Sequence, residues 1–329
     1  MDNISRQNEH KKLEELENIF PELESVLGSA EGSILNKFKV PKKKVYFIIG
    51  CARSGSTLLY QYLAKTGYFV YPTNFLSRFY YAPYIGYRLQ QALLDFDVKG
   101  EIFQQDSIKN NFSSNLGKTK GPKQAHEFWY FWNRFFKFGE LQQLSKEEIS
   151  NVNWSLFLKE LHALEEASKK PILMKAMNLN WNLKDLQKRI PNVHFIYIKR
   201  DILFNAQSLL LSRDKFFGDY KEWYSFKTPN YHSLKKLNPR VQVVEQVIAN
   251  NTAIETQLES VKNTNKTIIT YSNFCKQPLN IIQQLNCNGA NIIESNTDLN
   301  FKNGNKKRIS DSYFNEMLDY LSKRDNNEF

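Results

Sequence analysis

The segment VYFIIGCARSGSTLL, residues 45–59, decides the fold of this chain. Residues Val45–Ile49 form a continuous run of apolar, β-branched and aromatic side chains, which is typical of a strand buried on both faces of a parallel sheet. The run ends at Gly50. From Ser56 onward, apolar residues recur at helical spacing, namely Leu58, Leu59, Tyr62 and Leu63. The segment therefore predicts a strand, a loop with glycines and a helix.

The predicted loop has the features of a phosphate-binding loop. Gly50 and Gly55 have the G-x-x-x-x-G spacing, which turns backbone N–H groups inward, and the N-terminus of the next helix adds partial positive charge. In nucleoside triphosphatases a lysine stands where this chain has Ser56, whereas here the cation is Arg53. Three hydroxyl side chains can add donors: Ser54, Ser56 and Thr57. We expect a smaller anion than a magnesium-bound triphosphate.

Strands alternate with helices along the rest of the chain. The predicted strands are 45–49, 171–175, 193–198 and 266–271, and the predicted helices are 56–63, 183–189, 202–211, 279–285 and 310–323. This alternation favours parallel strands with helices on both faces. We therefore predict a P-loop-containing, three-layer α/β/α fold with a central parallel sheet.

A second anion-binding motif follows the strand at 193–198. Arg200 comes at the carboxyl end of this strand, and Ser208 lies eight residues later on the predicted helix. The guanidinium group is a forked donor suited to a phosphate, and the serine hydroxyl lies about two helical turns further along. Alone, Arg200 and Asp201 would be read as a surface ion pair. With the first loop, they predict a ligand with two anionic ends.

These two motifs resemble those of the sulfotransferases that use 3′-phosphoadenosine 5′-phosphosulfate (PAPS), in particular the carbohydrate, tyrosylprotein-like or bacterial branch. The family loop reads roughly G-x-P-[RK]-S-G-[ST]-T-x-L, and this chain departs from it at Ala52. In the second motif, Ile202 replaces the usual proline. The resemblance implies that PAPS is the donor, that 3′-phosphoadenosine 5′-phosphate (PAP) is the product, and that no metal is needed. It implies these donor-binding residues: Arg53, Ser54, Gly55, Ser56, Thr57, Leu58, Arg200, Ser208 and, in a weakly matching basic loop, Lys306.

Sulfuryl transfer to a hydroxyl requires a base and cations that stabilise the developing charge. Arg53 and Lys175 are the candidate cations, and the resemblance implies that a lysine at a strand end contacts the donor's sulfate or bridging oxygen. Glu127 and His126 are the candidate bases. A carboxylate among the aromatic residues that follow would have a raised pKa, so we expect Glu127 to be a strengthened base. We see no spacing of His, Cys, Asp and Glu that is typical of a metal site.

The predicted organisation is an N-terminal helical extension, residues 1–40, followed by a single sulfotransferase domain, residues 41–329. In the extension, a helix at 11–27 would place Leu13, Leu16, Ile19 and Phe20 on one face, with Pro21 interrupting the pattern. Residues 72–170 form a helical insertion rich in aromatic residues, which either lines the acceptor side of a cleft or caps the core. Residues 295–329 form a C-terminal loop and helix.

The composition limits the class of partner. A net charge of +11 suggests a polyanionic partner, such as nucleic acid, a membrane surface or a phosphate-rich small ligand, or it serves general solubility. We expect a small ligand and no nucleic-acid partner. Three cysteines imply no disulfide framework, and neither a signal peptide nor a membrane span is visible, so we expect a cytoplasmic protein. The resemblance to the bacterial branch implies a bacterial one. We expect a carbohydrate, glycolipid or other small-molecule acceptor. The alternatives are a P-loop kinase of small molecules, a basic nucleic-acid-binding protein and a sulfotransferase fold without activity.

Overall fold

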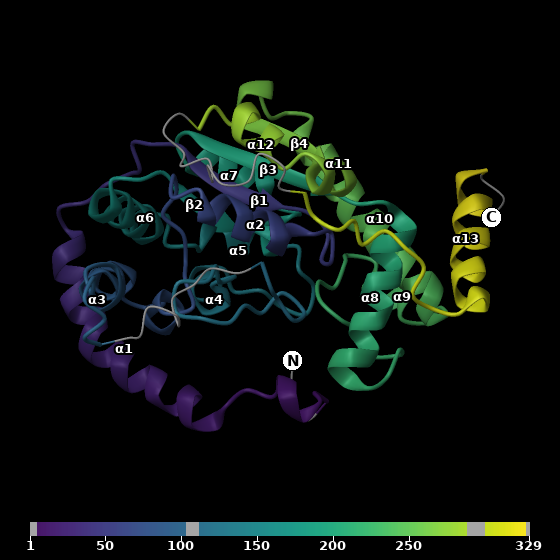
Figure 1. The fold of residues 1–329 in the computed structure, drawn as a ribbon, viewed down its shortest axis with the longest axis horizontal. Coiled ribbons are helices and arrows are strands. Elements are labelled where there is room, and N and C mark those ends of the chain that lie inside the picture. The colour runs from purple at the N-terminus through teal and green to yellow at the C-terminus, as the bar shows by residue number, and fades with distance from the viewer. Residues whose placement is uncertain (1–4, 103–111, 288–299, 327–329) are drawn as a thin grey trace.

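The computed structural model describes residues 5–102, 112–287 and 300–326. Within these residues, a four-stranded sheet of order β2-β1-β3-β4 forms the centre of the molecule, and every neighbouring pair is parallel (Figure 1). The strands are β1 (Val45–Ile49), β2 (Ile172–Lys175), β3 (Val193–Lys199) and β4 (Lys266–Thr270). All four predicted strands are confirmed. The last one ends a residue early because Tyr271 begins a helix.

Helices surround the sheet. The described α-helices are α1 (Glu14–Leu35), α2 (Ser56–Lys65), α3 (Pro83–Gln90), α4 (Trp129–Phe135), α5 (Lys146–Ser150), α6 (Trp154–Ser168), α7 (Leu183–Arg189), α8 (Ile202–Phe217), α9 (Tyr231–Leu234), α10 (Pro239–Leu258), α11 (Tyr271–Lys276), α12 (Leu279–Gln284) and α13 (Asp311–Asp325). The five predicted helices within residues 41–329 are confirmed, although α8 extends to Phe217, beyond the predicted end at residue 211. No described helix has the length and apolar character needed to cross a membrane.

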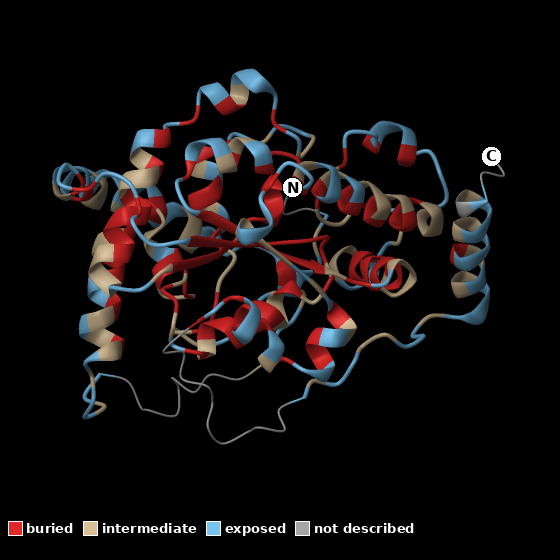
Figure 2. Cartoon of the chain, turned by 90° about the horizontal axis from the view of Figure 1, so that it is seen from above, coloured by how far each residue is buried: buried red, intermediate tan, exposed pale blue. Residues whose placement is uncertain are grey.

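Side chains of alternate residues on β1 point into two separate cores. Val45, Phe47 and Ile49 pack with residues of α4, α6 and α7 on one face, whereas Tyr46 and Ile48 pack with α2, α11 and α12 on the other. Every residue of β1 is buried, and Figure 2 shows buried strands at the centre of the molecule. The edge strand β4 is only partly buried. Burial on both faces explains the unbroken apolar run, and the three-layer α/β/α prediction is confirmed.

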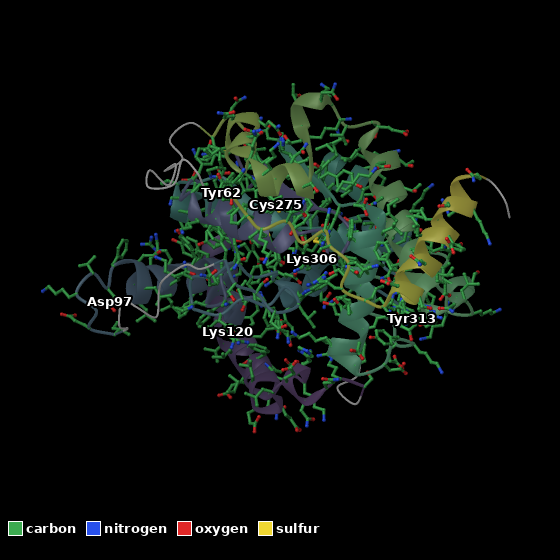
Figure 3. All side chains as sticks on the ribbon, turned by 45° about the vertical axis from the view of Figure 1, so that its right-hand side comes forward. Tyr62, Asp97, Lys120, Cys275, Lys306 and Tyr313 are labelled. Atoms are coloured by element: carbon green, nitrogen blue, oxygen red, sulfur yellow. The ribbon has the colours of Figure 1, made fainter. Side chains whose placement is uncertain are left out.

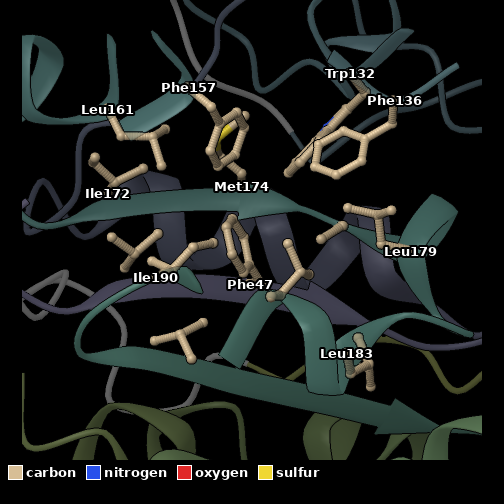
Figure 4. Packing of buried hydrophobic residues seen from close by; sticks show 14 of the residues in the cluster. Phe47, Trp132, Phe136, Phe157, Leu161, Ile172, Met174, Leu179, Leu183 and Ile190 are labelled. Atoms are coloured by element: carbon tan, nitrogen blue, oxygen red, sulfur yellow. The ribbon is translucent and has the colours of Figure 1, made fainter. Parts of the chain in front are cut away.

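The aromatic segment between α2 and β2 fills the first of these cores. Phe131, Trp132 and Phe136 are buried and pack with Phe157 of α6 over the sheet. Figure 4 shows Trp132 and Phe136 lying near Phe47 and Met174. Most aromatic residues at 128–136 therefore cap the core, which leaves few of them to line a binding cleft.

The N-terminal helix differs from its prediction in length and in the face that it buries. Helix α1 continues through Pro21 to Leu35. The proline is exposed, so water can hydrate the backbone carbonyl that its missing N–H group leaves unpaired. Leu13 and Ile19 are exposed, and it is Phe20, with Leu16, that packs on the insertion.

Parts of three predicted segments lie outside the described residues. These are residues 1–4 of the extension, residues 103–111 of the insertion, and residues 288–299 and 327–329 toward the C-terminus. The remainder of the C-terminal segment crosses the carboxyl edge of the sheet and ends in α13, whose first turn is capped by the Ser310 hydroxyl.

Candidate functional site

The loop after β1 depends on its two glycines. Gly55 has φ +97°, and a Cβ atom there would overlap the ring of Tyr271, while a Cβ atom on Gly50 would lie 2.7 Å from the carbonyl oxygen of Ile198. Arg53 also adopts a left-handed conformation, with φ +68°. The backbone is thus turned tightly between β1 and α2, as the glycine spacing predicts.

The loop offers donors suited to an anion. The hydroxyl of Ser54 is buried and has no hydrogen-bond partner within the described part of the chain. An unsatisfied buried hydroxyl is costly, and an anion at the N-terminus of α2 would satisfy it. Ser56, also buried, and Thr57 lie in the first turn of α2, and Leu58 packs against the second core. The loop therefore fits a phosphate or sulfate group.

Arg200 lies at the carboxyl end of β3 and is buried. Its Nη1 donates to the carbonyl oxygen of Arg53 at 3.0 Å, and its Nη2 donates to the carbonyl oxygen of Gly304 at 2.9 Å. The guanidinium group also lies over the ring of Tyr271, at 4.6 Å from the ring centroid. Burial lowers the pKa of Arg200, and the nearby cations Arg308 and Arg53 lower it further. The site is therefore electropositive.

Ser208 is buried on α8, and its hydroxyl accepts a long hydrogen bond from Nε of Arg53 at 3.4 Å. The side chain of Arg53 thus extends from the first loop toward the second motif. Together, Arg53, Arg200 and Ser208 form one basic group at the carboxyl edge of the sheet, as the two motifs predict. A cavity of about 330 Å³ opens beside it and is lined partly by Thr270, Tyr271 and Leu321.

The C-terminal loop, residues 303–308, covers this basic group. Asn305 Oδ1 accepts from Nε of Arg200 at 2.7 Å, and the Gly304 N–H donates to the Tyr271 hydroxyl at 3.2 Å. The Lys306 carbonyl oxygen accepts from Nε2 of Gln207 on α8, while the lysine side chain is exposed (Figure 3). The loop is therefore close enough for its lysine to reach a ligand at Arg200.

A second group of residues contains a buried cation and a carboxylate. Nζ of Lys175, at the end of β2, lies 2.5 Å from Oε1 of Glu127 and 3.2 Å from Oγ1 of Thr57. The side chain of Lys175 is 5% exposed, whereas that of Glu127 is 30% exposed. The side chains of Thr57, Glu127 and Lys175 thus meet beside the loop after β1, and the carboxylate remains partly exposed.

The expectation that Glu127 has a raised pKa was wrong. Burial does raise the pKa, but the ion pair and hydrogen bond with Lys175 lower it, as does the indole N–H of Trp129. The net pKa of Glu127 lies below its ordinary value, so the side chain is an ionised acceptor. The sequence does not show that a lysine 48 residues away reaches this carboxylate.

His126 has a different environment from its neighbour. Its Nδ1 accepts the backbone N–H of Phe128 at 2.9 Å, and burial lowers the pKa of His126 to about 4. Phe128 adopts a left-handed conformation, with φ +57°. The imidazole is thus neutral near pH 7 and stabilises a strained turn. These contacts favour Glu127 over His126 as the base.

Two residues at this site were not predicted. Trp129 donates its indole N–H to Oε2 of Glu127 at 2.6 Å. The ring of Tyr271 packs against Gly55 and Arg200, and its hydroxyl accepts the N–H group of Gly304. Only their positions in the sequence could have pointed to these residues. Trp129 is two residues after Glu127, and Tyr271 directly follows a strand.

A possible metal-binding group, which the sequence analysis missed, lies on α6, on the face of the sheet opposite α2. Ligand atoms of His162, Glu165 and Glu166 lie within 4.8 Å of one another. Glu165 accepts the backbone N–H of Lys42 at 3.0 Å, and Glu166 forms an ion pair with Lys169 at 2.6 Å. The first contact anchors the segment before β1 to α6, whereas the second is local to the end of α6. Neither contact belongs to the candidate site.

Comparisons with known proteins agree with the fold. A model of the sulfotransferase family matches residues 46–286. The structure is similar to that of the sulfotransferase STF9 from Mycobacterium avium, with a TM-score of 0.53 and 11% identity over 97% of this chain and 78% of that chain. The sulfotransferase STF1 from Mycobacterium tuberculosis H37Rv has a TM-score of 0.46 and 10% identity, over 91% of this chain and 76% of that one. A comparison with curated proteins found no match.

Proposed function

This chain belongs to the sulfotransferase family, and we propose that it transfers a sulfuryl group from PAPS to a hydroxyl group of a carbohydrate or glycolipid. The observation that carries the choice of donor is the pair of anion-binding groups at one edge of the sheet. The loop with the unsatisfied Ser54 hydroxyl suits a 5′-phosphosulfate, and Arg200 with Ser208 suits a 3′-phosphate. A nucleotide with anionic groups at both ends satisfies both.

We assign the donor contacts by the chemistry of the side chains. The phosphosulfate would be held by Ser54, Ser56, Thr57 and the backbone of Gly55. Leu58, in the first turn of α2, would contribute its backbone to the same site. Four residues would hold the 3′-phosphate end: Arg53, Arg200, Ser208 and Lys306. The cavity lined by Thr270 and Tyr271 supports this assignment, because it offers space beside Arg200 for the nucleoside. When bound, PAPS supplies a sulfuryl group already activated by its bond to phosphate.

Glu127 accepts the proton of the acceptor hydroxyl. Its low pKa keeps it ionised, and its partial exposure lets a hydroxyl reach it. Among the described residues, Lys175 uses two of its three N–H donors on Glu127 and Thr57, which leaves one donor for charge that develops on the oxygen atoms of the transferred sulfuryl group. A sulfuryl group carries less charge than a phosphoryl group, so Lys175 and the cations of the donor site suffice without a metal.

The kinase alternative is weaker on two counts. Ser56 replaces the lysine that a triphosphate requires. Asp201, which is the candidate for a magnesium ligand, accepts the backbone N–H of Phe204 at 3.1 Å and caps α8. One oxygen of its carboxylate is therefore used to cap the helix.

The test is transfer of labelled sulfate from PAPS to a panel of methyl pyranosides, alkyl glycosides and phenols, with and without EDTA. We expect transfer that EDTA does not reduce. Phosphate transfer from labelled ATP that requires magnesium, together with no sulfate transfer, would contradict the proposal and favour the kinase. Salt-dependent retention on DNA without binding of PAP would favour the nucleic-acid-binding alternative.

A further inference from the structure

We propose that Trp129 both positions Glu127 and forms the surface on which the ring of the acceptor stacks. The inference rests on the proposed function, in which Glu127 accepts the proton of the acceptor hydroxyl. It adds a residue to the acceptor site and restricts the acceptor to one whose hydroxyl is carried by a ring with a flat apolar face.

Trp129 is the most exposed aromatic residue of its segment. It is 38% exposed, whereas Tyr130 is partly buried and Phe128, Phe131, Trp132 and Phe135 are each at most 6% exposed. A tryptophan side chain presents a large apolar surface, and hydration of that surface is unfavourable. In a segment whose aromatic residues mostly fill the core, the exposed indole is available to a ligand.

The indole is also rigidly placed. Phe226, which is buried, packs against it with ring centroids 6.1 Å apart and an angle of 43° between the rings. The N–H group donates to Oε2 of Glu127 at 2.6 Å. The packing contact with Phe226 and the hydrogen bond with Glu127 restrain the ring, so the exposed surface is a preformed platform.

The carboxylate of Glu127 is held at both oxygen atoms. Trp129 binds Oε2, and Lys175 binds Oε1 at 2.5 Å, so the carboxylate plane has one orientation. Each oxygen retains a further lone pair that can accept the hydroxyl of an acceptor. Trp129 thus joins the proton acceptor to an exposed apolar surface.

The strained turn before α4 explains how neighbouring residues 127 and 129 can act together. Phe128 has a positive φ of +57°, and its N–H group is held by Nδ1 of His126. Left-handed backbone is unfavourable for phenylalanine, and such strain persists where surrounding contacts enforce it. Here it brings the indole N–H back to the carboxylate. A ring stacked on Trp129 would carry its hydroxyl within reach of Glu127.

The test compares Trp129→Phe and Trp129→Leu with Phe96→Leu, a control that also shortens an exposed aromatic side chain. Sulfate transfer from PAPS is measured with two ring probes, methyl pyranosides and phenol, and with acyclic probes of similar size, mannitol and 1-hexanol. The two ring probes distinguish a sugar from an aryl acceptor.

We expect Trp129→Leu to raise KM for the better ring probe on the order of 10-fold, with KM for acyclic probes unchanged. Trp129→Phe keeps a ring but loses the N–H donor, so KM changes less. The acid limb of its kcat profile should move to higher pH, because the pKa of Glu127 rises without that donor. A merely structural role for Trp129 would not move this limb.

The inference is overturned if Trp129→Leu leaves KM for both ring probes within about twofold of wild type, or if it affects ring and acyclic probes equally. If wild-type protein transfers no sulfate, the proposed function fails, and ring binding is then measured by saturation-transfer NMR. Loss of the pyranoside or phenol signal in Trp129→Leu but not in Phe96→Leu supports the stacking surface. No loss, or no signal with wild type, overturns it.

Discussion

Glu127→Gln separates the charge of this side chain from its shape. Glutamine has nearly the same size, and its amide oxygen can still accept the N–H group of Trp129. The amide cannot take a proton from a hydroxyl at neutral pH, and it leaves the ammonium group of Lys175 without a counter-charge. We therefore expect a large effect on turnover and a smaller effect on stability.

The two effects differ in origin and in size. A positioned general base contributes roughly 10²–10⁴-fold to rate, so turnover should fall by about that factor. Lys175 is 5% exposed and Glu127 is 30% exposed, so the pair lies between a surface ion pair and a fully buried one. Its loss should lower the free energy of unfolding by about 1–3 kcal/mol. A domain of ordinary stability, about 5–15 kcal/mol, remains folded after such a loss.

The assay measures single-turnover sulfate transfer with the best acceptor of the panel, PAP affinity by calorimetry and unfolding in urea. PAP affinity should stay within about threefold of wild type. Glu127 has a lowered pKa, so the stability difference between the two proteins is full above pH 4.5 and shrinks as pH falls below it. Glu127→Asp, which keeps the charge, should lose less activity. Turnover within about threefold of wild type in a folded Glu127→Gln protein would refute the assignment of the base.

Arg200→Gln should weaken PAP binding by on the order of 10- to 100-fold in calorimetry and leave AMP binding nearly unchanged, because a charged donor to the 3′-phosphate is lost. Gly55→Ala should lower the free energy of unfolding by about 1–3 kcal/mol in urea, because φ is +97° and a Cβ atom would overlap Tyr271. Burial lowers the pKa of His194 from 6.5 to about 4, so its contribution to stability is full above pH 6.5 and is lost as pH falls through 4. Over this range, unfolding in urea should show that wild type loses about 3 kcal/mol more stability than His194→Gln, because the contribution of His126 is common to both proteins.

Two positions away from the site supply controls for these predictions. Lys169→Gln removes a surface cation that pairs with Glu166 at the end of α6, and PAP binding should not change. Gly28→Ala adds a Cβ atom where no atom lies within 4 Å on α1, so stability should rise by about 0.5–1 kcal/mol. Equal effects at the paired positions would contradict the structural reasons given for Arg200 and Gly55.

The sheet was predictable because parallel strands buried on both faces read as unbroken apolar runs, as Val45–Ile49 does. Helix α10 was not predicted. It buries the amides Gln242, Gln246 and Asn250 among its apolar residues, which obscures the helical period. Its start does carry a signal, since Asn238 caps the helix and Pro239 follows at the first position.

The candidate site also contains parts that the sequence reveals and parts that only the fold reveals. The loop at 50–57 and the spacing of Arg200 and Ser208 are local patterns, so the sequence reveals them. The partner of Glu127 is a property of the fold, because Lys175 comes from a different strand end and reverses the expected direction of the pKa shift. The hydrogen bonds between Arg200 and residues 304–305 likewise join segments about 100 residues apart, which sequence spacing does not reveal.

The central claim is that the ligand is a nucleotide with phosphate at both the 3′ and 5′ positions. Calorimetry with PAP, AMP and magnesium–ATP on the same wild-type protein, with EDTA added to the first two, tests this claim most directly. The account predicts that PAP binds at least about 100-fold more tightly than AMP without a metal. Equal affinity for PAP and AMP, or tighter binding of magnesium–ATP, would contradict it.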